Sequence, residues 1–377
     1  MRELLGISWQ EFLLILGAFR TIWEELLEIR FTGPRALRAA MTTLSTSLSV
    51  TAALALHMDY VWWAAISGFM ATQATRPGSI QRALLRIVGT LAGAAVSLVV
   101  TPWLAYDHVA GSLFIFCVTT LGTLGFMLSP HAYAWLFATI TVNLIVLSSL
   151  QSPLLAVPAA FFRVYEVIIG SGIAVLVALA LAPEGVGTAP APRGWSGIWD
   201  RNWPHLLHAM RAGLTVMLLP WVWSWLVLPS PSQMSITVVA IMAVPTLAAD
   251  PMEGGRRVAS QSLQRIFGCL LGGLVGLGLL SLSLTDFVPW ILAFSAAIWV
   301  CSYLQSSERG LSYIGTQAGL VLIMTLVQSW GPPDSIWPGI DRFAGMIGGL
   351  SILLLVSLLI WPEKSASADT PGGSRPV

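Results

Sequence analysis

The chain has 377 residues, of which 56% are hydrophobic and 10% charged, and its formal net charge is +1. Soluble globular domains carry about 25% charged residues, so this composition predicts an integral membrane protein and excludes a soluble enzyme domain. A net charge near zero also excludes the basic surface typical of nucleic-acid-binding proteins.

The first segment of the chain mixes charged and apolar side chains. Leu, Ile, Phe and Trp recur at near-helical spacing among acidic residues such as Glu11 and Glu28. This pattern predicts an N-terminal amphipathic helix within residues 1–34, lying in the membrane interface or against a helix bundle.

Runs of apolar residues long enough to cross a membrane recur along the rest of the chain. A spanning helix needs about 20 mostly apolar residues. We predict twelve spans in two sets of six, at residues 37–57, 60–76, 84–104, 108–128, 131–150, 160–182, 208–228, 233–250, 264–283, 287–305, 311–330 and 341–361.

A linker rich in Pro and Gly, residues 184–206, separates two membrane units. The units are residues 35–183 and 207–363, and residues 364–377 are predicted to form a disordered C-terminal tail. The predicted fold class is an all-α polytopic membrane protein with about 12 transmembrane helices as two parallel six-helix repeats.

The second unit repeats the first when the sequence is aligned with itself, shifted by the number of residues that separates Arg86 from Arg265. The matching pairs include Arg86 with Arg265, Gly89 with Gly268, Gly93 with Gly272, Arg163 with Arg342, Gly170 with Gly349 and Pro183 with Pro362. An even number of spans in each unit makes the repeats parallel, and transporters built this way bind substrate at the repeat interface near the bilayer midplane.

Arginines at helix ends predict the orientation of the chain. With a cytoplasmic N-terminus, nearly all basic residues fall on the cytoplasmic side, and only Arg163 and Arg342 fall outside. Because cytoplasmic loops carry the excess of Lys and Arg, both termini are predicted to be cytoplasmic.

Four arginines are placed by the predicted spans at the cytoplasmic starts of the first and third helices of each unit: Arg38, Arg86, Arg211 and Arg265. They are candidates for a ring around an inner vestibule, because planar guanidinium groups bind carboxylates bidentately and concentrate organic anions. The alternative is that they only set the topology.

Arg163 and Arg342 oppose the charge bias at equivalent positions, which makes them candidates for an interior cavity that binds substrate. Glu166 lies one turn after Arg163, and Asp341 directly precedes Arg342. We predict Glu166 and Asp341 as proton-coupling groups, with Glu166 the stronger candidate because an apolar surrounding favours a neutral carboxyl. The alternative is a local salt bridge at the outer interface.

Four polar or aromatic residues within apolar segments are further candidates for substrate contacts. Tyr133 and Tyr313 lie near the inner ends of corresponding helices, where they could stack on an aromatic substrate. Asn143 and Gln317 are amides inside spans, and the alternative for both is a hydrogen bond between helices.

Known catalytic and cofactor motifs are missing from the sequence. There is no GxxxxGK[ST] motif for ATP, no HExxH motif and no Ser/His/Asp set, and the three cysteines have no CxxC spacing. We therefore expect no enzyme activity, no cofactor and no metal.

Two pairs of segments resemble a known family. RPGSIQRALLRIVGTLAGAAV and DPMEGGRRVASQSLQRIFGCLLGG, with RVYEVIIGSGIAVLVALALAPE and DRFAGMIGGLSILLLVSLLIWPE, are similar to the membrane units of the fusaric acid resistance or aromatic acid exporter superfamily. The resemblance spans most of residues 35–363.

This resemblance implies an efflux transporter of the bacterial inner membrane for aromatic or other small organic acids, driven by the proton gradient. It also implies, as partners, a periplasmic adaptor and an outer-membrane channel. Related plant proteins with one unit per chain pair as anion channels, so a passive organic-anion channel is one alternative. A non-transporting scaffold subunit is another.

Overall fold

The computed structural model describes residues 17, 20–104, 107–151, 153–185, 203–226, 231–243, 251–328, 335 and 337–359. These ranges are helical and contain no β-strand, so the all-α class is confirmed for the described part of the chain. Much of the predicted N-terminal helix, most of the linker 184–206 and the whole tail 364–377 lie outside the described residues.

A helical segment at residues 20–27 is followed by two sets of six helices. The first set is α2 (Pro34–Ala55), α3 (Val61–Ala71), α4 (Arg76–Leu104), α5 (His108–Leu128), α6 (Ala132–Gln151) and α7 (Ala156–Leu181). The second set is α8 (Trp203–Leu226), α9 (Pro231–Met242), α10 (Pro251–Leu280), α11 (Phe287–Gln305), α12 (Ser312–Leu326) and α13 (Trp337–Leu359).

Seven helices of the described chain are long and apolar enough to cross a membrane, namely α4, α5, α6, α7, α10, α11 and α13. The protein is therefore a multi-pass membrane protein. Three further apolar helices are shorter, with 11 residues in α3, 12 in α9 and 15 in α12. The count of twelve spans stays a prediction.

Two long helices begin earlier than hydropathy indicates. The predicted spans start at residues 84 and 264, whereas α4 begins at Arg76 and α10 at Pro251. Hydropathy marks the apolar part of a helix, and the polar first turns continue beyond it. Arg86 and Arg265 therefore lie well inside their helices, and not at the helix starts where the sequence placed them.

Glycines let neighbouring helices touch along their backbones, in the same way in both sets. Gly89 and Gly93 of α4 lie against backbone carbonyls of α6, and Gly268 and Gly272 of α10 lie against backbone carbonyls of α12. A Cβ atom at any of these positions would collide with backbone, which accounts for small residues at membrane helix interfaces. These contacts fix α4 against α6 and α10 against α12, which are the third and fifth helices of each set.

The short helices α3 and α9 are held in the same manner by the last helix of each set. Gly170 of α7 lies against the carbonyl of Ala64 in α3, and Gly349 of α13 lies against the carbonyl of Met234 in α9. Nearly every side chain of α3 is buried. These two helices therefore lie inside the bundle, where their side chains meet the long helices on several sides.

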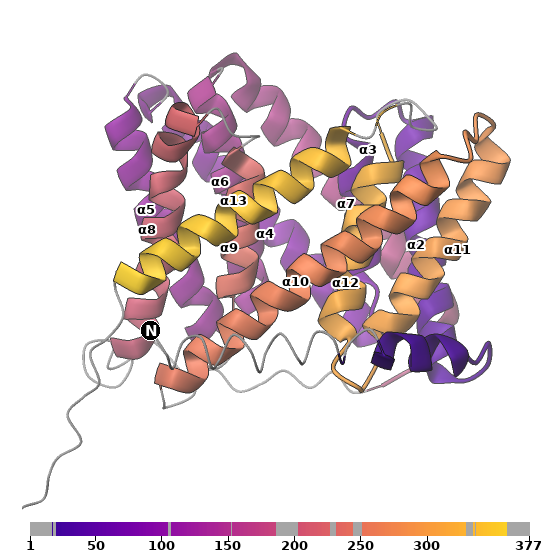
Figure 1. The fold of residues 1–377 in the computed structure, drawn as a ribbon. Helices are drawn as coiled ribbons and strands as arrows, with labels where there is room; N and C mark the ends of the chain where they lie inside the picture. The colour runs from indigo at the N-terminus through magenta and orange to yellow at the C-terminus, as the bar shows by residue number, and fades with distance from the viewer. Residues whose placement is uncertain are drawn as a thin grey trace, which may run out of the picture.

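Contacts between the two sets are reciprocal. Helix α5 packs on α8, and α11 packs on α2, while α6 contacts α9 and α12 contacts α3. Figure 1 shows α5 with α8 at one end of the bundle and α2 with α11 at the other, with α10 and α13 slanting across its front. Hydrogen bonds join both end pairs, from Trp221 to Ser112 at 3.0 Å and between Ser47 and Ser295 at 2.7 Å.

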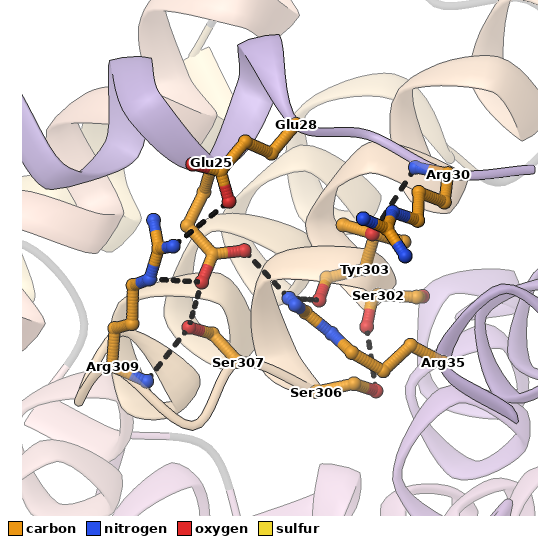
Figure 2. A network of polar contacts seen from close by, with 9 residues as sticks. All are labelled: Glu25, Glu28, Arg30, Arg35, Ser302, Tyr303, Ser306, Ser307 and Arg309. Atoms are coloured by element: carbon orange, nitrogen blue, oxygen red, sulfur yellow. Dashed lines mark hydrogen bonds and ion pairs between the residues drawn. The ribbon is translucent and has the colours of Figure 1, made fainter. Parts of the chain in front are cut away.

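The helical segment at residues 20–27 is anchored by a polar network around Glu25 (Figure 2). The carboxylate of Glu25 is 2.7 Å from Arg35 Nη2 and accepts a hydrogen bond of 2.8 Å from Ser307 Oγ. Arg309 lies 3.7 Å from the same carboxylate and donates to Glu28 at 2.8 Å. Ile22 packs on α10, α11 and α12 beside this network.

This network lies outside the membrane-spanning segments and ties the N-terminal part of the chain to the α11–α12 turn. Burial alone would raise the pKa of Glu25, but hydrogen bonds from Arg35 and Ser307 and the charges of Arg35 and Arg309 outweigh burial and lower that pKa. Glu25 is therefore ionised at neutral pH, as a counter-ion to two arginines.

Candidate functional site: two buried arginine clusters

Arg86 is fully buried on α4 and is held by α3 and α6. Its Nε donates a hydrogen bond of 3.1 Å to Ser67 Oγ, and its Nη1 donates one of 3.3 Å to the hydroxyl of Tyr133. The guanidinium carbon lies 4.0 Å from the centre of the Phe137 ring, which is a cation–π geometry. Nη2 has no hydrogen-bond partner among the described residues.

Arg163 is the second buried arginine of this cluster. Its guanidinium carbon lies 3.5 Å from the ring centre of Trp63, and its three nitrogens have no hydrogen-bond partner in the described chain. Trp63 and Ser67 are one turn apart on α3, so a single face of this short helix contacts both Arg163 and Arg86.

Glu166 supplies the negative charge of this cluster. It is fully buried, and its Oε1 accepts a hydrogen bond of 3.1 Å from the backbone N–H of Tyr60, the residue before α3. A carboxylate at a helix N-terminus is stabilised by the helix dipole. No ion pair joins Arg163 to Glu166 among the described residues, so the local salt bridge considered from the sequence is not formed there.

The second half of the chain builds a corresponding arrangement. Arg265 of α10 donates hydrogen bonds of 3.4 Å to the hydroxyls of Tyr313 and Thr237, on α12 and α9. Arg342 of α13 donates a short hydrogen bond of 2.7 Å to Gln233 Oε1 on α9. Both arginines are buried, with exposed fractions of 1% and 4%.

We call these groups the first-half cluster and the second-half cluster. The first-half cluster comprises Trp63, Ser67, Arg86, Tyr133, Phe137, Arg163 and Glu166. The second-half cluster comprises Gln233, Thr237, Arg265, Tyr313, Gln317 and Arg342. In each, arginines from the third and sixth helices contact residues one turn apart on the short second helix, and a tyrosine of the fifth helix contacts the first arginine.

The remaining predicted residues lie elsewhere or serve packing. Arg38 and Arg211 are half-buried on the first helix of each set. Asn143 is buried and pairs with Thr119 at 3.0 Å, which joins α6 to α5. Asp341 is exposed, whereas the next residue, Arg342, turns inward to Gln233.

Sequence reasoning missed the part played by the short helices. Trp63, Ser67, Gln233 and Thr237 are not among the candidates singled out from the sequence. The signal was present, because Trp63 with Gln233 and Ser67 with Thr237 share one separation along the sequence. This separation is shorter than the one from Arg86 to Arg265, because the connection before the third helix differs in length, so the fixed offset does not align them.

Comparison with known proteins agrees with the resemblance noted from the sequence. Residues 48–177 match a family model described as fusaric acid resistance protein-like. The resemblance to the fusaric acid resistance family is confirmed for this segment. The chain is also 24% identical over 161 residues to the inner membrane protein YeeA of Escherichia coli, a match that covers 42% of each chain. No solved structure matches the chain.

The fusaric acid resistance-like segment contains every residue of the first-half cluster and ends before the second-half cluster. Together the clusters place four guanidinium groups inside the helix bundle of a membrane protein. A charged side chain at the centre of a membrane helix costs about 3 kcal/mol, and such residues usually face a cavity, a partner or a transported ion. Both clusters are therefore candidates for a functional site inside the bundle.

Proposed function

We propose that this protein exports small organic anions, aromatic acids among them, across the bacterial inner membrane. The observation that carries this proposal is the presence of two buried arginine clusters at corresponding places in the two halves. The guanidinium group binds carboxylates through charge and a matching planar geometry. The match to fusaric acid resistance-like proteins supports organic acids as the substrates, and the match to an inner membrane protein supports the inner membrane as the location.

The proposed path runs between two parallel six-helix repeats that together make twelve spans. Corresponding glycine contacts, corresponding arginine contacts and reciprocal packing between the halves support this layout. Repeats of this kind place the substrate site at their interface near the bilayer midplane. The distribution of arginines supports a cytoplasmic location for both termini.

Proton coupling is the finer part of the proposal, with Glu166 as the coupling group. It is buried inside α7, one turn after the buried Arg163. A passive organic-anion channel is the alternative, because a membrane potential that is negative inside already drives anions outward. A periplasmic adaptor and an outer-membrane channel are proposed as partners of the exporter.

The test is uptake of radiolabelled benzoate into inverted membrane vesicles, with a pH gradient that is acid inside. Valinomycin and equal potassium on both sides hold the membrane potential at zero. Accumulation above the outside concentration, abolished by nigericin, supports proton-coupled export. Neutral benzoic acid would move the other way, so leakage through the lipid cannot imitate this result.

Two further outcomes separate the alternatives. Uptake that follows an imposed potential and ignores the pH gradient identifies an anion channel. If neither benzoate nor other aromatic acids are taken up above the level of empty vesicles, the transport proposal is contradicted. The alternative that then remains is a non-transporting scaffold subunit. Arg20→Gln is a matched control, because the side chain of Arg20 is 85% exposed and outside both clusters.

A further inference from the structure

The two clusters differ in their charge. The first-half cluster holds two guanidinium groups and the carboxylate of Glu166. The position equivalent to Glu166 in the second half is Gly345. Among the described residues the buried acidic side chains are Glu25 and Glu166, and Glu25 belongs to the N-terminal network. The second-half cluster therefore carries two positive charges with no carboxylate in contact within the described chain.

Unused donors are present in both clusters. Nε of Arg265 and Nε of Arg342 have no hydrogen-bond partner in the described part of the chain, and neither do Nη2 of Arg86 and the three nitrogens of Arg163, so the difference between the clusters is the carboxylate of Glu166. The two bonds that Arg265 makes are 3.4 Å long, beyond the usual range for N–H···O hydrogen bonds. Buried guanidinium groups without a counter-ion are costly, so the second-half cluster lacks a negatively charged hydrogen-bond acceptor.

Gln317 marks the side from which such an acceptor can approach. It lies one turn after Tyr313 on α12, and its side chain packs against Gly268, one turn after Arg265 on α10. Its side-chain amide is buried, and the amide oxygen has no hydrogen-bond partner among the described residues. The N–H groups of the same amide, and not this oxygen, are what can donate to an anion. In the first half the equivalent residue is Phe137, whose ring faces Arg86 and leaves no polar group there.

We propose that the second-half cluster binds one monovalent anion, a carboxylate or a halide, between Arg265 and Arg342, whereas in the first-half cluster the carboxylate of Glu166, one turn after Arg163, supplies the negative charge. The inference rests on the proposed function, since it assigns the anion site of that path to one half. Binding itself does not require transport, so the two can be tested apart.

The experiment is equilibrium binding of radiolabelled benzoate to the purified full chain in lipid nanodiscs at pH 7. We expect one benzoate per chain in the wild type. Glu166→Gln removes the resident carboxylate and should raise the number to two. Gln317→Glu supplies a carboxylate of nearly the same shape beside Arg265 and should lower the number to zero.

Arginine variants locate the site. Arg342→Gln should weaken binding by about tenfold or more, since it removes charge-assisted hydrogen bonds. Arg163→Gln, the equivalent change in the first-half cluster, should weaken binding less than Arg342→Gln does. Arg20→Gln is the control, because its side chain is 85% exposed and outside both clusters, and it should change affinity by less than about threefold. Competition with chloride and with acetate distinguishes a halide site from a carboxylate site.

The proposal is overturned if Arg342→Gln and Arg163→Gln lose the same binding affinity, or if Glu166→Gln binds the same number of benzoates as the wild type. It is also overturned if the protein binds neither benzoate nor chloride. Gln317→Glu deletes no buried charge and keeps the test available if an arginine variant does not fold. Binding at the second-half cluster without any flux contradicts the transport proposal alone, whereas flux with both clusters equally required contradicts this inference alone.

Discussion

The first-half and second-half clusters share one backbone frame and surround their arginines with different chemistry. Hydroxyl groups accept hydrogen bonds from the first arginine in both halves. The first half adds two aromatic rings and the buried carboxylate of Glu166, whereas the second half adds the amide of Gln233. The frame is set by glycines and short helices, which correspond between the halves. Helix packing and charge compensation are therefore separable features of this bundle.

The frame is tested by filling its glycine contacts, where we expect the largest effect. Gly170→Val and Gly349→Val should each destabilise the protein by more than about 3 kcal/mol, because a backbone carbonyl cannot move aside as a side chain can. Gly170 has the tighter contact, so its variant should be the worse. Yield of monodisperse protein and its unfolding temperature in detergent are the measurements.

Gly172→Val is the control for this pair, since a Cβ at Gly172 would meet nothing within 4 Å. It should remain within about 1 kcal/mol of the wild type. If Gly349→Val were tolerated as well as Gly172→Val, the two halves would not share a packing frame.

Much of this frame could be predicted from the sequence, and the chemistry of the clusters could be predicted only in part. Apolar runs located the helices, and one fixed offset paired Arg86 with Arg265 and Arg163 with Arg342. Hydropathy could not show that α4 and α10 begin turns earlier. It also could not show which aromatic ring meets Arg163, because Trp63 reaches it through tertiary packing between α3 and α7.

Charge compensation in the first half is tested by Glu166→Gln. With two buried guanidinium groups left without a carboxylate, the protein should lose about 2 kcal/mol of stability. High concentrations of benzoate should restore part of the loss, because a bound anion stabilises the folded state. Thermal unfolding with and without benzoate measures both effects.

Glu28→Gln is the matched control, because this side chain is 64% exposed and lies outside both clusters. It should change stability by less than about 1 kcal/mol. An unfolding temperature for Glu166→Gln that equals that of Glu28→Gln would mean that Glu166 does not compensate the buried arginines.

The contact between Phe137 and Arg86 is expected to contribute less. Phe137→Leu keeps an apolar side chain but removes the ring under the guanidinium group, and should cost about 1 kcal/mol. The same substitution in an Arg86→Met background should cost less, and the difference between the two costs is the coupling energy. Identical costs in both backgrounds would show that the ring serves packing alone.

The smallest effect should come from Glu25, whose charge lies outside the spans. Its pKa is lowered in the folded protein, so its contribution is present above the ordinary glutamate pKa and is lost as pH falls through the lowered value. Glu25→Gln should cost about 0.5–1 kcal/mol at pH 7, and the cost should shrink as pH falls below the ordinary glutamate pKa. Unfolding temperatures of both proteins as pH is lowered test the sign, and a cost that does not shrink contradicts it.

The burial of α3 on all sides has a consequence for how the chain tolerates amino-acid changes. Helix α4 leaves Leu84, Val88 and Leu91 exposed at helical spacing, so substitutions on that side can be accepted at every third or fourth position. Helix α3 has no such permissive side, since nearly all of its 11 residues are enclosed. A scan of all substitutions along the chain should therefore show a helical rhythm of tolerance in α4 and a continuous block of intolerance in α3.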